Sequence, residues 1–374
     1  MNRIPALAWV AAAALAASLP AVLALPTGKS INLPGDQVWV DTGVDVQAGD
    51  TYRFDASGEV TYAGARSATP PDGSSKGWRD LTRAFPAEDA NRGAVIGRIG
   101  SGDAALPFLI GASKQVTMPI AGRLFLGINH PSNLTADGSF TVILNKLQSA
   151  TKDAATFTGK LPELGAAYFG RIPRRVTDPH GTPGDRVNFA IVGPEDLMKE
   201  AFKTAGWVVV DKNVEDTILK GAIATFSKQA YLTLPMSMLR LFGRNQDYGF
   251  AHAEPIAVVT QRHHFRIWKS PDDADGSTVW IGAGTHDIGF DRDQRNNGLT
   301  HKIDPDTDKE RDYIVETLKQ TGMVVKTDFI TPKDTITKAK TAHGEDFFTD
   351  GRIVIVWLRP AAAGVSTTSA SSNR

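Results

Sequence analysis

The sequence predicts two domains of different fold class, an antiparallel β-sandwich followed by an α+β domain with a mixed sheet. A chain of 374 residues usually forms two domains, each able to bury its own core. Between residues 29 and 147, apolar residues alternate with polar ones and turn signals separate the runs, which is typical of antiparallel strands. Between residues 185 and 358, apolar residues at helical spacing alternate with short apolar runs, which indicates helices mixed with strands.

Composition excludes several classes of function. Lys plus Arg equals Asp plus Glu at 41 each, so no net charge attracts nucleic acid, and we expect no nucleic-acid partner. The chain contains no cysteine, which excludes disulfides, thiolate metal sites and cysteine nucleophiles. No nucleophile elbow, phosphate loop or dinucleotide-binding glycine pattern occurs either.

Residues 1–24 have the pattern of a signal peptide. Arg3 precedes an apolar run from Ala6 to Leu19, and Val22-Leu23-Ala24 offers small residues for cleavage after Ala24. The alternative is an uncleaved anchor, because residues 4–25 are about as long as the roughly 20 residues that span a bilayer. In either case we expect an exported protein, periplasmic or secreted if cleaved and membrane-anchored if not.

The strands of the first domain, residues 29–147, are predicted from paired apolar positions. These are Val38 and Val40, Tyr52 and Phe54, Val60 and Tyr62, Leu124 and Leu126, and the run Phe140, Val142 and Leu144. Antiparallel sheets with one face solvated give this alternation. The segment 67–93 is too long for a hairpin, so we expect a functional or partly ordered loop there.

Four segments of this domain resemble the bacterial calcium-dependent galactophilic lectins, a sandwich of jelly-roll type. They are GEVTYAG, GAVIGRIGSG, GRLFLGINHPSN and DGSFTVIL, within residues 43–144. The resemblance implies a galactose-type sugar and calcium at one end of the sheets. The ligands would be the Tyr62 carbonyl and the loop that runs from Asn129-His130 to Gly138-Ser139-Phe140.

The loop departs from the lectin pattern at the calcium ligands. His130 replaces an acid, and Thr135 and Ala136 replace paired asparagines. Calcium prefers oxygen ligands, so we do not expect it here, although Asn133 and Asp137 could rebuild a site. Carbohydrate binding without calcium, and a role as spacer or docking module, remain the alternatives.

Residues 148–184 are predicted as a linker with one ordered piece, Ala166 to Phe169, and residues 359–374 as a disordered tail. Within 185–358, Pro194-Glu195-Asp196 opens a helix that Gly206 ends. A second helix is expected at 214–226, and a third from Asp304-Pro305-Asp306 to Gly322. The predicted strands are 187–192, 207–210, 256–268, 278–287, 323–325 and 353–357.

The second domain resembles the LssY C-terminal domain family. The resemblance rests on VNFAIVG, AFKTAGW, LFGRNQDYGF, QRHHFRIW, VWIGAGTHDIGF and THKIDPDTDKERD, covers about residues 185–327 and extends to 358. Members of this family often accompany membrane-embedded segments that are lipid-phosphatase-like or transporter-like, which makes membrane association an expectation. The family has no assigned reaction.

The histidines of this domain predict a polar site. If 261–268 pairs antiparallel with 279–287, His263 and His264 point to opposite faces. A register shift of one residue swaps which of them lies beside His286, so one of them does in either register. We expect His301 or Asp304, from the next segment, to converge on the same pocket.

Three interpretations of this cluster stay open. His263, His264, His286 and His301 are candidate ligands for a divalent transition metal such as zinc or iron. Histidine and aspartate could instead form a metal-free acid–base site. Alternatively, the histidines are hydrogen-bonded within a half-buried sheet and bind nothing. Further candidate binding residues are Arg262, Asp287 and the bunched Arg244, Asn245, Gln246 and Asp247, for which a solvated turn is the alternative.

The sequence therefore predicts an exported cell-envelope protein of unassigned activity. The first hypothesis is a binding or adaptor protein for an envelope glycan, a lipid headgroup or a protein partner. The alternative is a hydrolase, metal-assisted or not, that acts on an envelope phosphoester or lipid through the histidines.

Overall fold

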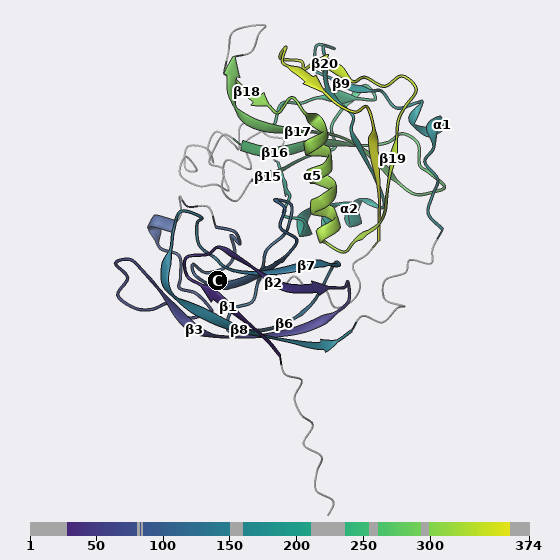
Figure 1. Cartoon of the computed structure of the whole chain (residues 1–374). Coiled ribbons are helices and arrows are strands. Elements are labelled where there is room, and N and C mark those ends of the chain that lie inside the picture. The colour runs from purple at the N-terminus through teal and green to yellow at the C-terminus, as the bar shows by residue number, and fades with distance from the viewer. Residues whose placement is uncertain are drawn as a thin grey trace, which may run out of the picture.

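The computed structural model describes residues 28–80, 83, 85–149, 160–210, 236–253, 261–292 and 299–359 (Figure 1). The predicted signal peptide, the predicted helix at 214–226 and the tail from 360 lie outside these residues, as does 150–159 of the predicted linker. In the part of the chain that the structure describes, no helix is long and apolar enough to cross a membrane.

The first domain is a sandwich of two four-stranded sheets in which every pairing is antiparallel. One sheet has the order β1(Lys29–Pro34), β8(Ala136–Gln148), β3(Thr51–Tyr62), β6(Ser113–Thr117). The other has the order β2(Trp39–Val46), β7(Gly122–Ile128), β4(Val95–Ile99), β5(Phe108–Leu109). A short 3₁₀ helix, η1(Trp78–Asp80), lies in the long loop between β3 and β4.

Alternating apolar residues build the core of this sandwich. Phe140, Val142 and Leu144 of β8 are buried, and Phe54 of the adjacent β3 is fully buried. The inner faces of the two sheets meet in one hydrophobic cluster that also contains Leu124 and Leu126. The predicted all-β antiparallel sandwich is confirmed.

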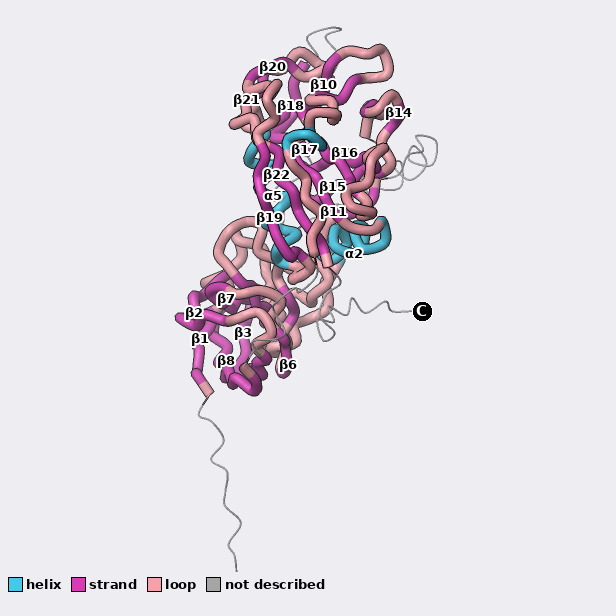
Figure 2. The backbone as a smooth tube through the Cα atoms, turned by 90° about the vertical axis from the view of Figure 1, so that its right-hand side faces the viewer, coloured by secondary structure: helices cyan, strands magenta, loops and turns pink. Residues whose placement is uncertain are grey.

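The second domain is organised around a mixed sheet, as predicted, and this sheet has eight strands. Its order is β12(Val208–Val209), β15(Tyr248–Ala253), β16(Gln261–Lys269), β17(Val279–Arg292), β11(Phe189–Val192), β22(Ile353–Leu358), β19(Val324–Ile330), and β18(Leu299–Ile303) also pairs with β17. Of these pairings, only β11 with β22 is parallel. Strands far outnumber helices in both domains (Figure 2).

Two helices cover one face of this sheet. They are α2(Glu195–Thr204) and α5(Thr307–Gln320), whose apolar side chains join Phe250 and Phe265 of the sheet in one core cluster. The predicted starts of both helices are correct: Pro194 precedes α2, and the Asp306 carboxylate accepts a hydrogen bond from the backbone of Asp308 at the N-terminus of α5. In α5, buried Ile314 and Leu318 face this core.

The other face is covered by smaller elements. These are the short helix α1(Ala166–Phe169) and a four-stranded sheet of β10(Pro183–Arg186), β9(Arg175–Thr177), β13(Arg240–Leu241) and β14(Arg244–Asn245). Leu164, Phe169 and Val176 share a core cluster with Trp268 of the main sheet. Residues 164–176, within the predicted linker, therefore pack as part of the second domain. The remaining strands, β20(Lys338–Lys340) and β21(Asp346–Phe348), form a separate hairpin.

Candidate functional site

Three histidines lie in a row across three neighbouring strands of the main sheet. In the register of β15, β16 and β17, His252 is opposite His263, and His263 is opposite His286. Directly opposed residues in antiparallel strands point to the same face. The predicted hairpin of β16 and β17 is therefore present, and His263 is the member of the doublet that lies beside His286.

The rings of this row are stacked. His263 lies 4.1 Å from His286 between ring centroids, with 10° between the ring planes. Its other side stacks on Tyr313 of α5, at 3.7 Å and 9°. His263 is thus held between two parallel rings, and its orientation is fixed by packing from both sides.

Helix α5 supplies two polar groups to this row. Glu310 Oε2 lies 2.5 Å from Nδ1 of His263, and Tyr313 Oη lies 2.7 Å from Nδ1 of His252. Positions three apart on a helix share a face, so Glu310 and Tyr313 both point to the sheet. We call these five residues, His252, His263, His286, Glu310 and Tyr313, the histidine row.

The histidine row consists of a buried pair of residues and a half-buried rim. His263 and Glu310 are 5% and 1% exposed, so this imidazole and carboxylate form a buried pair. His252, His286 and Tyr313 are half-buried, and we call these three residues the rim; Nε2 of His286 is itself buried. A buried carboxylate that orients a histidine beside half-buried imidazoles is suited to anion binding and to proton transfer.

The second histidine of the doublet belongs to a different cluster, on the opposite face of the sheet. His264 Nε2 lies 2.9 Å from Asp287, and Arg262 approaches the same carboxylate at 3.8 Å. His264, Arg262 and Asp287 are all buried. Burial lowers the pKa of His264, and Asp287 offsets this only in part. A buried neutral imidazole with a carboxylate partner is a structural arrangement.

Asp304 does not converge on the histidines. One of its carboxylate oxygens accepts a hydrogen bond from the backbone of Asp306, and the other lies 3.0 Å from Lys309 Nζ. Asp304 therefore shapes the turn before α5, and its contact with β17 is through the backbone, to the carbonyl of His286. The backbone of His301 pairs with Phe290, and its side chain lies outside what the structure describes.

The bunched polar residues 244–247 hold a hairpin turn together. Arg244 pairs with Asp247 at 2.8 Å and donates to the Lys269 carbonyl, while Asp247 accepts from the Lys269 backbone. Gln246 is buried and accepts from the backbone of Leu239. Asn245 is exposed. Arg244, Gln246 and Asp247 thus make local contacts, which favours the turn interpretation.

The lectin-like loop of the first domain is largely covered by the chain itself. Asn129 is fully buried: its carbonyl oxygen accepts from the Ala87 backbone, and its amide donates to the carbonyls of Ala87, Ala90 and Asn91. It thus fastens the long loop between β3 and β4 across the place where the resemblance puts a ligand.

The neighbours of Asn129 are also buried. His130 and Tyr62 meet edge to face at 6.1 Å, and burial lowers the pKa of His130 and raises that of Tyr62 to about 12. Asn133 and Asp137 are exposed, so these two candidate ligands face solvent, whereas Tyr62, Asn129 and His130 are buried.

The described residues hold no group of three or more His, Cys, Asp or Glu side chains arranged to bind a metal. The row contains three imidazoles, but two of them stack face to face, and stacked rings do not aim their nitrogens at one point between them.

Sequence reasoning did not include Glu310, Tyr313 or His252 among the site residues. Glu310 lies in the acidic first turn of α5, where a carboxylate also has a simple local role beside the helix N-terminus. The available signal was the spacing of Glu310, Tyr313 and Ile314 on one helix face, which places the two polar side chains beside the core.

Comparisons with known proteins found matches among solved structures and among protein families. A solved structure described as the EclA N-terminal domain, a PllA-like lectin, matches with 20% identity and a TM-score of 0.25, covering 31% of this chain and 94% of that one. A search of curated proteins finds no match. The model of the family described as LssY C-terminus matches residues 169–353. This match includes the histidine row and begins within the predicted linker, and it confirms the predicted resemblance of the second domain to the LssY C-terminal domain family.

Proposed function

We propose that this protein is an envelope binding protein whose second domain recognises the anionic headgroup of a lipid, through a phosphate bound at the histidine row. The observation that carries the proposal is the half-buried rim of His252, His286 and Tyr313 beside the buried pair of His263 and Glu310. The signal-peptide pattern of residues 1–24 supports an exported location, and the lipid would then be one of the envelope.

The chemistry of the rim suits a phosphate. Imidazole N–H groups are hydrogen-bond donors, and a phosphate beside the rim would accept a hydrogen bond from them that its charge strengthens. Glu310 lies on the buried side, against His263, so its negative charge does not face the rim. The Tyr313 hydroxyl, beside His252, adds a neutral donor.

Hydrolysis of a phosphoester is the second candidate for the same row. The observation that favours it is the short contact between Glu310 and His263, since a buried carboxylate that orients an imidazole is the usual support of a general base. In this case the bound headgroup would be a substrate and not a ligand.

Calorimetric titration of the full chain tests both candidates. We expect dihexanoyl phosphatidic acid to bind, and inorganic phosphate to bind more weakly at the same place. Uncharged dihexanoylglycerol should not bind. His286→Gln should weaken phosphatidic acid binding at least tenfold, whereas His180→Gln, in an exposed loop, is the matched control and should have no effect.

Release of inorganic phosphate from the same lipid separates binding from hydrolysis. Turnover that is lost in Glu310→Gln would establish the hydrolase. Binding without turnover would establish the adaptor, and equal affinity in His286→Gln and the unmodified chain would refute both.

For the first domain we propose an uncharged glycan as partner. The supporting observations are that Trp78 on η1 is 76% exposed, and that Asn133 and Asp137 are exposed as well. An exposed tryptophan offers a flat apolar face, and the two polar side chains offer hydrogen bonds. A glycan array probed with the full chain and with Trp78→Ala tests this, and an unchanged pattern for the variant would refute it.

A further inference from the structure

The hairpin of β20 and β21 is held in place by contacts with the rest of the second domain. Two strands alone are marginally stable. Here the Phe348 backbone donates to the Pro305 carbonyl at 2.8 Å. Arg175 donates to the carbonyl of Lys340 and lies over the ring of Phe347. The hairpin is therefore fastened both to the turn before α5 and to β9, and it can keep a defined shape.

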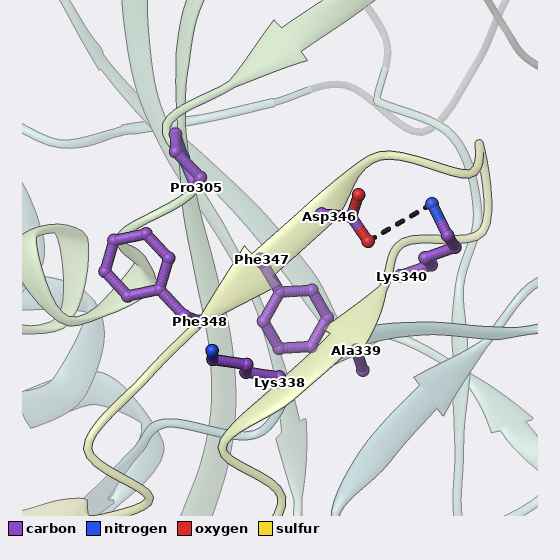
Figure 3. A pocket seen from close by; sticks show the side chains of 7 residues that line it. All are labelled: Pro305, Lys338, Ala339, Lys340, Asp346, Phe347 and Phe348. Carbon is purple, nitrogen blue, oxygen red and sulfur yellow. Dashed lines mark ion pairs between the residues drawn. The ribbon is translucent and has the colours of Figure 1, made fainter.

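A cavity of about 400 Å³ lies between this hairpin and the turn before α5 (Figure 3). This volume is within the range of small-molecule sites, about 300–1,000 Å³. Its walls are mostly apolar and include Pro305, Ala339, Phe347 and Phe348. Phe347 is almost fully buried, whereas Phe348 is 46% exposed. The exposed ring leaves apolar surface in water that a ligand could cover.

The charged side chains around this cavity differ in whether they have an ion-pair partner. Lys340 Nζ lies 3.1 Å from the Asp346 carboxylate, so these two compensate each other. The nearby acids of the turn are also engaged, Asp304 with Lys309 and Asp306 with the N-terminus of α5. Lys338 is exposed, and among the described residues it forms no ion pair. The cavity thus combines apolar walls with one uncompensated positive charge.

We propose that this hairpin cavity binds a free organic anion with an apolar tail, of the class of medium-chain carboxylates. The tail covers Phe348 and Pro305, and the carboxylate pairs with Lys338. In Figure 3 the side chains of Lys338, Phe347 and Phe348 gather on the hairpin, with Pro305 on the neighbouring segment. This site is separate from the histidine row and does not depend on the function proposed for it.

Calorimetric titration of the full chain with decanoate, below its micelle concentration, tests the proposal. Decanoate should bind with one-to-one stoichiometry, and decyltrimethylammonium, which has the same tail and the opposite charge, at least tenfold more weakly. Phe348→Ala should weaken decanoate binding about tenfold, because it removes the exposed aromatic ring of the apolar wall. Lys338→Met keeps the aliphatic stem and should weaken it up to about fivefold, the range of an exposed ion pair.

Leu147→Ala is the control for non-specific adsorption, since this side chain is 51% exposed on the sandwich, and it should bind decanoate like the unmodified chain. Three results would overturn the proposal. These are no saturable binding of decanoate, equal affinity in Phe348→Ala and the unmodified chain, and equal affinity for the cationic and anionic amphiphiles. Phe348 and Lys338 are exposed, so both variants should keep the melting temperature of the unmodified chain.

Discussion

The imidazole of His263 stacks on the ring of Tyr313 with 3.7 Å between centroids and 9° between planes. This contact joins the centre of the main sheet to helix α5. The Tyr313 hydroxyl reaches His252 at 2.7 Å, so one side chain touches two members of the histidine row. Side chains of the sheet and of α5 therefore contact each other at the proposed site. A substitution at Tyr313 should change the surroundings of both His252 and His263.

Two substitutions at Tyr313 should separate its ring from its hydroxyl. Tyr313→Phe keeps the stack and removes one hydrogen bond, so it should cost about 1 kcal/mol of unfolding free energy. Tyr313→Ala also removes the stack on His263 and should cost about 3 kcal/mol, at the low end for aromatic deletions because the side chain is half-buried. Urea unfolding measures both. Equal costs would show that the stack contributes nothing.

Glu310 should be the most sensitive polar residue of the row. It is 1% exposed and lies 2.5 Å from His263. Removing one partner of a buried pair typically costs about 3–5 kcal/mol, and we expect this for Glu310→Ala. Glu310→Gln retains an oxygen acceptor and should cost clearly less. Glu316→Ala, an exposed acid of the same helix, is the control and should change the midpoint of urea unfolding little.

The sequence was sufficient to predict the pairing of the histidine strands but not their register. Alternation of side chains required that either His263 or His264 lie beside His286. The choice depends on a shift of one residue, and both faces of this strand are buried, so the hydrophobic pattern does not decide it. In the structure, His263 is the histidine that meets Glu310 and Tyr313 of α5.

The partners of the histidines were beyond sequence reasoning for a related reason. Helical spacing shows that Glu310 and Tyr313 share a face, but not which strand that face meets. Asp304 illustrates the reverse error: its position before a helix gave it a local role in the turn, and proximity to His301 in the sequence did not bring it to the site. Likewise, the sequence shows the lectin-like motif around Asn129, but it does not show that residues 87–91 of a distant loop bury this side chain.

The stability of the second domain should fall as the pH falls below about 6.5. Burial lowers the pKa of His264 in the folded state, so the unfolded chain binds the proton more readily. A group with a depressed folded pKa contributes stability that is present above its unfolded pKa of 6.5 and is lost as the pH falls through the folded value. Urea unfolding at pH 7.5 and 5.5 measures the loss. His264→Gln should reduce this pH dependence, whereas the exposed-loop variant His180→Gln should leave it unchanged.

Asp350 should add stability that is lost at more acidic pH. Hydrogen bonds from Arg311 and Arg352 outweigh the effect of burial and lower its pKa from 3.8 to about 2. The stabilisation is therefore complete above pH 4 and disappears as the pH falls toward 2, with a size of up to about 2 kcal/mol. Asp350→Asn should lower the melting temperature at pH 6 and change it much less at pH 2.5. A constant difference at both pH values would contradict the assignment.

Calcium should not stabilise the first domain, because the residue that the lectin resemblance offers as a ligand is already engaged. The Asn129 amide contacts three carbonyls and one backbone donor of residues 87–91. A calcium ion at the loop would have to break these contacts. We expect the melting temperature of the sandwich to be the same with millimolar calcium and with chelator, whereas a ligand at about 100 times its dissociation constant would add about 2.7 kcal/mol. Asn129→Ala should destabilise the sandwich by about 3 kcal/mol or more, since it leaves several buried backbone groups without partners, and calcium should not rescue it. A rise of several degrees with calcium that is abolished by Asp137→Ala would show instead that exposed Asn133 and Asp137 form the site.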